Sequence, residues 1–329
     1  MSKKESEKNS DKIHDLVLFK TKEDSRSEAI DKYTFEKVDQ ENKIKLYNEF
    51  GPYSGHYRYI IFVDNQSLAP ITQIKIKIKF PEFLNLLRGF PPNINISHTT
   101  TAYNIKQINL EFAELNEKSS KQIYLYFSPS TLDNKGEIRT IVSYVNNKDI
   151  VRVLDSRPAE ITVDAITIEP KVVPSSFIRE FSQKPGIKKA IKSIGIGTSY
   201  KVDSEIYYNI LEHVFLINNF QLVAKDPKRG ILWYFGTESK IKEDILAIGQ
   251  LVSNKIDIIA TSQNQYLLIG FLTLFYNDFK EQILMNGIVN SKDEIYDLEC
   301  LYCGTCLPDF PKKGKAIECE KCKYKQIVW

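Results

Sequence analysis

The chain has 329 residues, of which 42% are hydrophobic and 26% charged, and its formal net charge is +3. This length suits two domains with a small additional module. So small a net charge does not by itself indicate nucleic-acid binding. The N-terminal sequence MSKKESEKNSDK is not followed by the apolar core of a signal peptide, and the best apolar candidate, residues 266–276, is about half as long as a transmembrane helix requires. We therefore expect neither a signal peptide nor a transmembrane helix.

Residues 1–30 are charged and poor in aromatic side chains, a composition that predicts disorder. A short apolar patch, residues 14–19 (HDLVLF), interrupts them. This patch fits an edge strand or a loose local contact, with a docking peptide as the alternative.

Residues 31–170 carry the pattern of β-strands. In residues 74–80 apolar side chains alternate with lysines, so that one face of the strand is apolar and the other charged. The same alternation recurs in residues 108–112, 123–127 and 161–163. Seven or eight such strands, separated by polar turns and without a convincing helix, predict an antiparallel, Ig-like β-sandwich. The insert at 81–92 is expected to be a surface loop with a short helix at 82–87.

The pattern changes after Pro170, and residues 171–290 predict an α+β platform, a sheet with helices on one face. Apolar residues at helical spacing predict helices over 177–194, 241–252 and 264–286. The first of these helices is expected to break at Pro185–Gly186. Strands are expected over residues 205–214, 220–224, 231–235 and 256–260.

The C-terminal residues 291–329 contain all five cysteines of the chain. Four of them form two C-x-x-C units, Cys300/Cys303 and Cys319/Cys322. Two such units about fifteen residues apart can close four thiolates around one tetrahedral Zn²⁺. The spacing therefore predicts a zinc ribbon. Because four thiolates leave no open position for water or substrate, the site should be structural rather than catalytic.

A tetrahedral metal site takes four ligands, and the chain has five cysteines. The first unit is followed by Gly304, which tolerates the positive φ that a metal knuckle often requires, whereas the overlapping unit that ends at Cys306 is followed by leucine and proline. We therefore expect the ligands Cys300, Cys303, Cys319 and Cys322, with Cys306 a spare or an occasional substitute. Iron is the alternative metal, because the first unit also resembles a rubredoxin knuckle, but Lys323 replaces the second glycine and favours zinc. Unpaired thiols or disulfides without a metal are a further alternative.

Cysteines of the metal-binding type predict a cytoplasmic protein. If the metal is structural, its removal should unfold residues 295–329 and leave the larger domains melting normally.

Catalytic motifs are weak throughout the chain. Gly195-Ile196-Gly197 superficially begins a dinucleotide loop, but the expected helix precedes it and the later glycine is missing. The four histidines are scattered, and His213 beside Glu212 fits a surface position better than a general base. The sequence therefore predicts no enzyme.

One strand offers a candidate for partner binding. Residues 233–235 are consecutive aromatics, so that Trp233 and Phe235 face one side of the strand and Tyr234 the other. One face must pack against helices, and the other face or its rim can provide an aromatic anchor for a peptide, with Trp233 as the candidate residue. Packing of all three rings in the core is the alternative.

A strand-rich sandwich followed by an α+β platform resembles the appendage of vesicle-coat adaptors, particularly that of the gamma subunit of the COPI coatomer. The residues that carry the resemblance are 159–164, the linker 168–170, the segment 187–196, the strands 208–211, 220–224 and 233–236, and Glu238–Ser239. The helical trunk and hinge of such coat subunits are absent from this chain, and the ribbon is additional. The resemblance implies a non-enzymatic hub that captures short peptide motifs in membrane traffic.

The alternative function is that of a nucleic-acid-associated zinc-ribbon protein in transcription or RNA processing. Its binding groups would be the ribbon lysines, with Tyr302, Tyr324 and Trp329 as stacking platforms.

Overall fold

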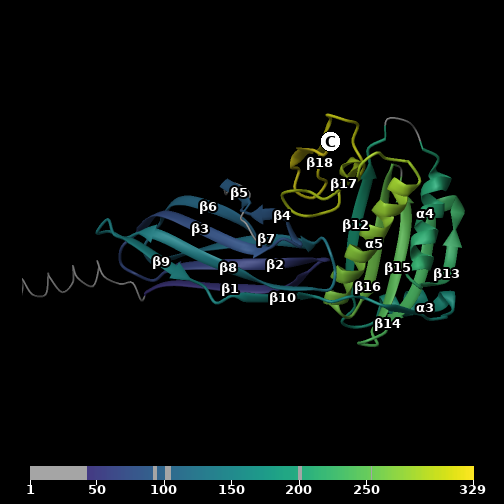
Figure 1. Cartoon of the computed structure of the whole chain (residues 1–329), viewed down its shortest axis with the longest axis horizontal. Helices are drawn as coiled ribbons and strands as arrows, with labels where there is room; N and C mark the ends of the chain where they lie inside the picture. Colours follow the sequence, from purple (N-terminus) through teal and green to yellow (C-terminus); the bar gives the residue numbers. More distant parts are fainter. Residues whose placement is uncertain (1–42, 92–94, 101–104, 199–201, 253) are drawn as a thin grey trace, which may run out of the picture.

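The computed structural model describes residues 43–91, 95–100, 105–198, 202–252 and 254–329. In this part of the chain two β-rich bodies lie end to end, and a small C-terminal ribbon sits against both near their junction (Figure 1). The predicted disorder at 1–30 and the apolar patch at 14–19 lie outside the described residues. No helix in the described part is long and apolar enough to cross a membrane.

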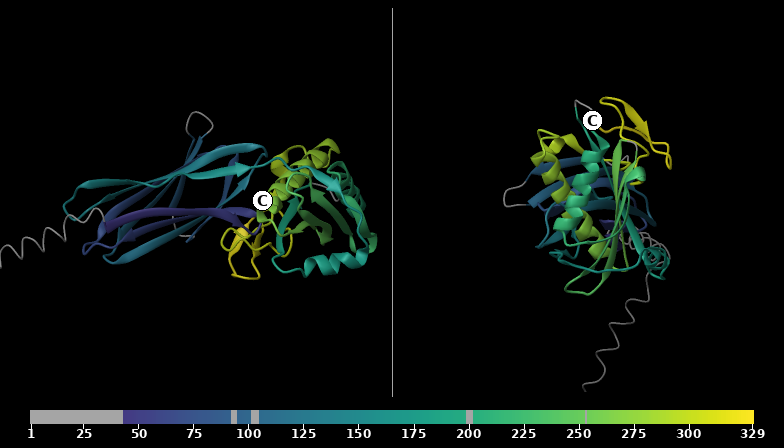
Figure 2. Two further views of the ribbon diagram at one scale, coloured as in Figure 1. Left: turned by 90° about the horizontal axis from the view of Figure 1, so that it is seen from below. Right: turned by 90° about the vertical axis from the view of Figure 1, so that its right-hand side faces the viewer.

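The first body is an antiparallel sandwich of two sheets. The first sheet contains, in spatial order, β1 (Ile44–Tyr53), β2 (His56–Asn65), β7 (Ser119–Pro129) and β4 (Leu84–Phe90). The second contains β10 (Ala159–Val163), β8 (Asn134–Val145), β3 (Ile71–Pro81), β6 (Ile105–Leu115) and β5 (Asn95–Thr100), with β9 (Val151–Asp155) also paired to β8. Figure 2 shows the two sheets packed face to face along the length of this body.

Strict alternation places the sandwich core. The apolar residues of β3, among them Ile74, Ile76 and Ile78, are buried, while the lysines between them are exposed. The expectation of a helix at 82–87 was wrong, because this segment is the edge strand β4. It pairs with β7, where Leu84 is fully buried, and this pairing outweighs local helix propensity.

The second body is the platform, a seven-stranded antiparallel sheet with helices on both faces. Its strands are β11 (Ile168–Pro170), β14 (Ile231–Glu238), β15 (Asp244–Val252), β16 (Lys255–Ser262), β12 (Lys188–Ile196) and β17 (Ile295–Asp297), with β13 (Gln221–Asp226) also on β14. Helices α4 (Ser204–Ile217) and α5 (Gln265–Met285) pack on one face, and the short α3 (Ser175–Ser182) packs on the other. The remaining elements are the 3₁₀ turns η2 (Pro227–Arg229) and η3 (Lys292–Glu294) and the ribbon strands β18 (Ala316–Glu318) and β19 (Lys325–Ile327).

Three platform segments differ from the sequence-based expectation. The second piece of the predicted helix over 177–194 is β12, and the predicted helix over 241–252 is β15. Both strands carry isoleucines on each of their faces, so these residues also match a helical period. The predicted strand 205–214 is α4, whose start is fixed by the Asp203 side chain accepting the Glu205 N–H at 3.1 Å. The predicted helix 264–286 is confirmed as α5.

Helix α5 joins the two bodies. Its Leu268 and Phe271 are buried in the platform core, whereas Ile269 is buried in the sandwich core. At the same junction the Asn277 side-chain amide donates to the Ser130 carbonyl at 2.8 Å. One helix therefore belongs to both hydrophobic cores, which should couple their unfolding.

We predict that Ile269→Ala lowers the free energy of unfolding by about 2–5 kcal/mol, because it leaves a cavity in a fully packed core. Met285→Ala at the exposed end of the same helix should change it by less than about 0.5 kcal/mol. Denaturant titration followed by circular dichroism measures both changes. Two separate transitions in the wild-type protein would show that the bodies unfold independently.

Candidate metal centre

The ribbon, residues 298–329, begins where the platform sheet ends. Strand β17 pairs with β12 through Ile194–Ile196, and the Leu298 N–H continues this pairing by donating to the Ser193 carbonyl at 2.9 Å. The first C-x-x-C loop follows at once, and the second forms the turn between β18 and β19 of a small hairpin. The backbone of the first loop is therefore anchored directly on the sheet.

The two cysteine loops have the same backbone geometry. In the first, the Cys300 N–H donates to the Thr305 carbonyl at 2.9 Å and the Gly304 N–H donates to the Cys300 carbonyl at 2.8 Å. In the second, Cys319 donates to Tyr324 and Lys323 donates to Cys319, both at 2.9 Å. Gly304 has φ +69° and Lys323 has φ +62°. Lys323 thus adopts the left-handed backbone that Gly304 has in the first loop, and the missing glycine does not distinguish zinc from iron.

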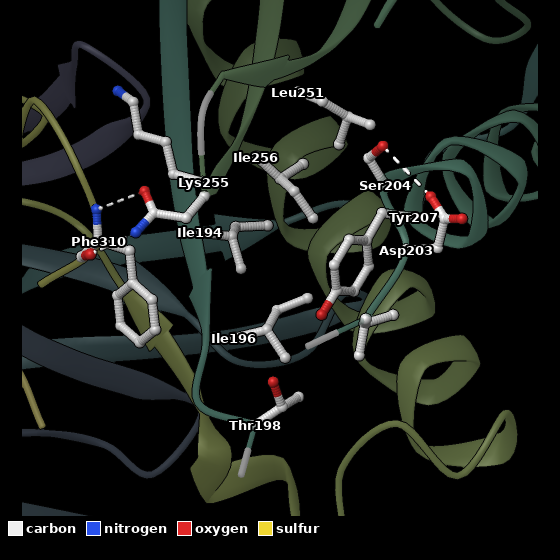
Figure 3. A pocket seen from close by; sticks show the side chains of 12 residues that line it. Ile194, Ile196, Thr198, Asp203, Ser204, Tyr207, Leu251, Lys255, Ile256 and Phe310 are labelled. Carbon is white, nitrogen blue, oxygen red and sulfur yellow. Dashed lines mark hydrogen bonds between the residues drawn. The ribbon is translucent and has the colours of Figure 1, made fainter. Parts of the chain in front are cut away.

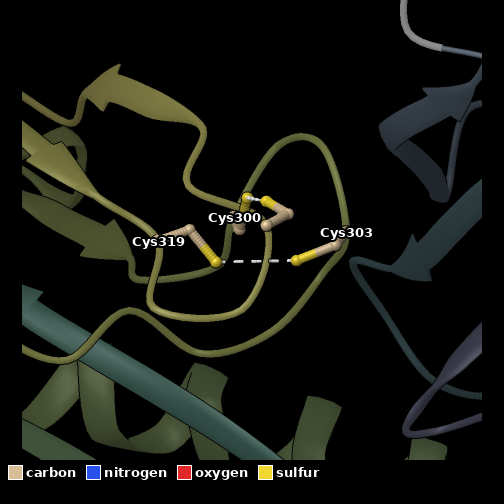
Figure 4. Close-up of side chains that lie close together, drawn as sticks. Cys300, Cys303 and Cys319 are labelled. Atoms are coloured by element: carbon tan, nitrogen blue, oxygen red, sulfur yellow. Dashed lines mark hydrogen bonds between the residues drawn. The ribbon is translucent and has the colours of Figure 1, made fainter.

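The two loops bring four sulfurs together (Figure 4). The ligand atoms of Cys300, Cys303, Cys319 and Cys322 all lie within 4.8 Å of one another. The Sγ atoms of Cys300 and Cys322 are 3.5 Å apart, and those of Cys303 and Cys319 are 3.6 Å apart. Four sulfurs at this spacing could hold a metal ion in a closed tetrahedral site, without a position for substrate.

Cys306 lies outside this group of four sulfurs. Its backbone forms an isolated bridge with Glu299, and its half-buried thiol lies beside Ser193 of β12. Burial raises the pKa of the Cys306 thiol. Cys306 thus faces the platform sheet rather than the other cysteines.

Glu299, next to Cys300, links the ribbon to the sandwich. Its carboxylate accepts from His56 Nε2 at 2.9 Å and lies 3.5 Å from Arg88 Nη1. All three side chains are almost completely buried. Although burial opposes ionisation, the charges of His56, Lys192 and Arg88 lower the pKa of Glu299 to about 2. No local sequence pattern marks this cluster, because its members are separated by up to 243 positions.

The other side of the ribbon packs on the platform through aromatic rings. A Cβ at Gly195 would lie 2.2 Å from the Phe310 ring, and one at Gly197 would lie 2.7 Å from the Trp329 ring. The two rings stack on each other with centroids 5.0 Å apart. The expectation that a helix precedes Gly195-Ile196-Gly197 was wrong, because the motif ends strand β12. Its glycines admit the ribbon aromatics, and no dinucleotide loop follows.

The predicted stacking groups of the ribbon have different environments. Trp329 is occupied in the contact with the platform, where its indole N–H donates to the Pro311 carbonyl at 2.6 Å. Tyr302 and Tyr324 are exposed and stack on each other at 5.9 Å. The three rings therefore do not form one stacking platform.

Trp233 lies on the face of the platform sheet that points away from α4 and α5. Tyr234 is buried in the core beneath those helices, and Phe235 is buried against α3. Trp233 itself is half-buried and stands opposite Ile248 in the adjacent strand. The structure thus separates the three aromatics as the alternation predicts, with Trp233 outside both cores.

Trp233 ends an apolar row that crosses four strands, which we call the stripe. Its members stand directly opposite one another in register: Ile191 of β12, Ile259 of β16, Ile248 of β15 and Trp233 of β14. All four are half-buried. On the opposite face of the same strands, Ala190, Ala260, Ala247 and Tyr234 are fully buried. The stripe is therefore only partly covered, with Ile248 packed against the cluster that includes Phe235 and Leu246, whereas the row on the opposite face is fully covered.

A cavity of about 680 Å³ opens where α4 begins, on the helix-covered side of the sheet (Figure 3). Its floor includes Ile194, Ile196 and Ile256, and its rim includes Asp203 and Ser204. The residues that line it include neither histidine nor cysteine. His213 is exposed on α4 and does not line it. The lining of the cavity combines isoleucines with polar side chains such as Asp203, Ser204 and Lys255.

No model of a known protein family matches the chain, and no curated protein matches it in sequence. Three of the solved structures that it resembles are a non-cellulosomal cohesin from Archaeoglobus fulgidus, an uncharacterized protein with an immunoglobulin-like fold from Nocardia farcinica and the major pilin SpaD from Corynebacterium diphtheriae. The cohesin is 11% identical, with 36% of this chain and 88% of the cohesin covered and a TM-score of 0.25. The Nocardia protein is 10% identical, with 36% of this chain and 98% of that protein covered and a TM-score of 0.27. The pilin is 10% identical, with 47% of this chain and 42% of the pilin covered and a TM-score of 0.29.

The resemblance to the appendage of the coatomer gamma subunit was wrong. The comparison finds cohesin, immunoglobulin-like and pilin structures in its place. Two segments that carried the resemblance also fold differently, since residues 188–196 form a strand and residues 204–217 a helix. The role in vesicle traffic rested on this resemblance alone and falls with it.

We predict one bound metal ion per chain in the wild-type protein and in Cys306→Ser, because Cys306 faces the sheet. Cys319→Ser should lose most of the metal, since three thiolates no longer close the tetrahedron. Elemental analysis of the purified proteins measures the stoichiometry and identifies zinc or iron. Equal metal loss in both variants would contradict this assignment.

Metal removal should loosen more than the ribbon. Because β17 and the ribbon aromatics cover β12, and Glu299 holds His56 and Arg88, chelation should increase hydrogen exchange at residues 188–196 and 84–90. Residues 74–80 in the sandwich interior serve as the internal control and should stay protected. An increase confined to residues 298–329 would support the independent unfolding expected from the sequence.

Proposed function

We propose that this chain is a non-enzymatic protein-interaction protein that presents the open face of its platform sheet to a partner protein. The stripe of Ile191, Ile259, Ile248 and Trp233 is the observation that supports this function. Apolar rows of this kind are normally covered completely, and a half-buried row that ends in an aromatic anchor is typical of a docking surface.

The two elements on either side of the stripe, α3 and the ribbon, support the same function. Helix α3 covers the sheet on one side of it, through Phe181 against Phe235. The ribbon covers the other side, where the Lys255 amine donates to the Leu307 carbonyl at 3.0 Å. Figure 2 (left) has α3 and the ribbon on the side of the sheet away from α5. A partner that docks between them would meet a rigid floor and two fixed walls.

The metal site belongs to this function as a structural element. We propose that Cys300, Cys303, Cys319 and Cys322 bind Zn²⁺, which would stabilise the wall that the ribbon forms. Zinc fits four thiolates in a closed site, and the protein would then work in a reducing compartment such as the cytoplasm. Nucleic-acid binding by the ribbon is not favoured, because Trp329 is occupied in packing and Tyr302 stacks on Tyr324.

The test is a photo-crosslinking side chain placed at Trp233, with the same side chain at the exposed Met285 on α5 as the matched control. In extracts of the cells that produce the protein, position 233 should give a defined protein adduct that excess unlabelled protein competes away. Ile259→Asp should abolish that adduct. An adduct that forms equally from position 285, or that persists in Ile259→Asp, would argue against docking on the stripe.

A further inference from the structure

The carboxylates that border the stripe on the open face of the sheet are already paired. Asp257 accepts from the Ser193 hydroxyl at 2.5 Å and lies 3.3 Å from the Lys255 amine. Asp244 accepts from the Lys171 amine at 2.7 Å, and Asp226 lies 3.7 Å from the Arg229 guanidinium. These carboxylates therefore have their charge compensated before any partner arrives.

Five lysines near the two walls, which are α3 and the ribbon, have no carboxylate among the described residues that compensates their charge. On the α3 side, Lys184 packs over the ring of Phe177 at 5.0 Å, and Lys189 is exposed at the end of the row next to the stripe. On the ribbon side, the loop that follows Phe310 contributes three exposed lysines: Lys312, Lys313 and Lys315.

Within the described part of the chain none of these five lysines forms an ion pair. The exposed carboxylates on the same elements are Glu180 of α3 and Asp309, Glu318 and Glu320 of the ribbon. Of these, Glu318 already lies 3.6 Å from the Lys325 amine. The apolar stripe thus lies between two walls with a net positive charge.

We propose that the partner segment which docks on the stripe is an acidic amphipathic helix, an inference that rests on the proposed function. The stripe spans three strand spacings, about 14 Å. Apolar side chains on successive helical turns recur about every 5.4 Å, close to the spacing of about 4.8 Å between strands. Three such side chains would fill the row between Ile191 and Trp233, while carboxylates on the flanks of the helix would face the lysines of both walls.

The composition of the floor favours a peptide over a single-stranded nucleic acid. Nucleic-acid grooves of this kind combine basic walls with several aromatic rings on which successive bases stack. Here the floor has one ring, Trp233, and three isoleucines. Branched aliphatic side chains pack against the apolar face of a helix and provide no stacking platform.

The experiment uses the full-length, metal-loaded protein and three synthetic amphipathic peptides of about 16 residues that share one apolar face. The remaining positions carry glutamate, glutamine or lysine. The two tryptophans give two indole N–H signals in an NMR spectrum, and a Trp233→Phe variant assigns them. The glutamate peptide should shift the Trp233 signal and bind about tenfold more tightly than the glutamine peptide, since several exposed ion pairs add to the same apolar contact. The signal of Trp329, occupied in ribbon packing, should not move.

Charge variants test the assigned walls. Replacing Lys184 and Lys189 by glutamine should remove most of the preference for glutamate, whereas the same change at Lys77 and Lys79, exposed on the sandwich, should leave it intact. Raising the salt concentration should narrow the difference between the two peptides.

Three results would overturn the inference. If the glutamate and glutamine peptides bind equally, the partner is not acidic, although the stripe still docks a protein. If no peptide shifts the Trp233 signal while crosslinking from position 233 persists, the partner is not an amphipathic helix. If a short oligothymidine shifts the signal more strongly than the glutamate peptide, the surface binds nucleic acid.

Discussion

The carboxylate of Glu299 is the contact on which the arrangement of the three parts depends. It lies beside the first cysteine of the metal centre, yet its partners His56 and Arg88 belong to the sandwich. The buried Lys192 of the platform, which pairs with Asp297 at 2.7 Å, also stabilises the charge of Glu299. Because a buried charge that loses its partner is costly, the ribbon cannot leave without destabilising both bodies. The metal centre is therefore part of the junction.

Sequence patterns predicted the sandwich better than the platform, for a physical reason. In β3 one face meets the core and the other meets water, so isoleucine and lysine alternate and the period of two is unambiguous. In β15 both faces are apolar, with Ile245 beneath α4 and α5 and Leu246 beneath α3. A strand buried on both sides has no contrast between its faces, and its isoleucines then fit a helix equally well.

The candidate sites also differ in how far the sequence could predict them. The cysteine cluster is local, since each loop is fixed by a few consecutive residues. The C-x-x-C spacing, together with the position of Gly304, selected the four sulfurs that come together. The alternation along β14 also placed Trp233 on the face away from Tyr234. The stripe as a whole could not be predicted, because it depends on the register of four neighbouring strands whose order in the sheet differs from their order in the sequence. Lys323 adopts the left-handed backbone that glycine residues favour, so a missing glycine was a poor guide to the metal.

The two faces of the platform sheet are covered very differently. Helix α5, with 21 residues, and α4, with 14, cover one face, and small side chains such as Ala190 and Ala247 let them approach closely. On the other face α3 has only 8 residues, and the ribbon reaches the sheet through Gly195 and Gly197 near the end of β12. Between these covers large side chains stand in the row of the stripe, where solvation alone would favour polar ones. An apolar row kept between two basic walls is consistent with selection for a partner rather than for the stability of the isolated chain.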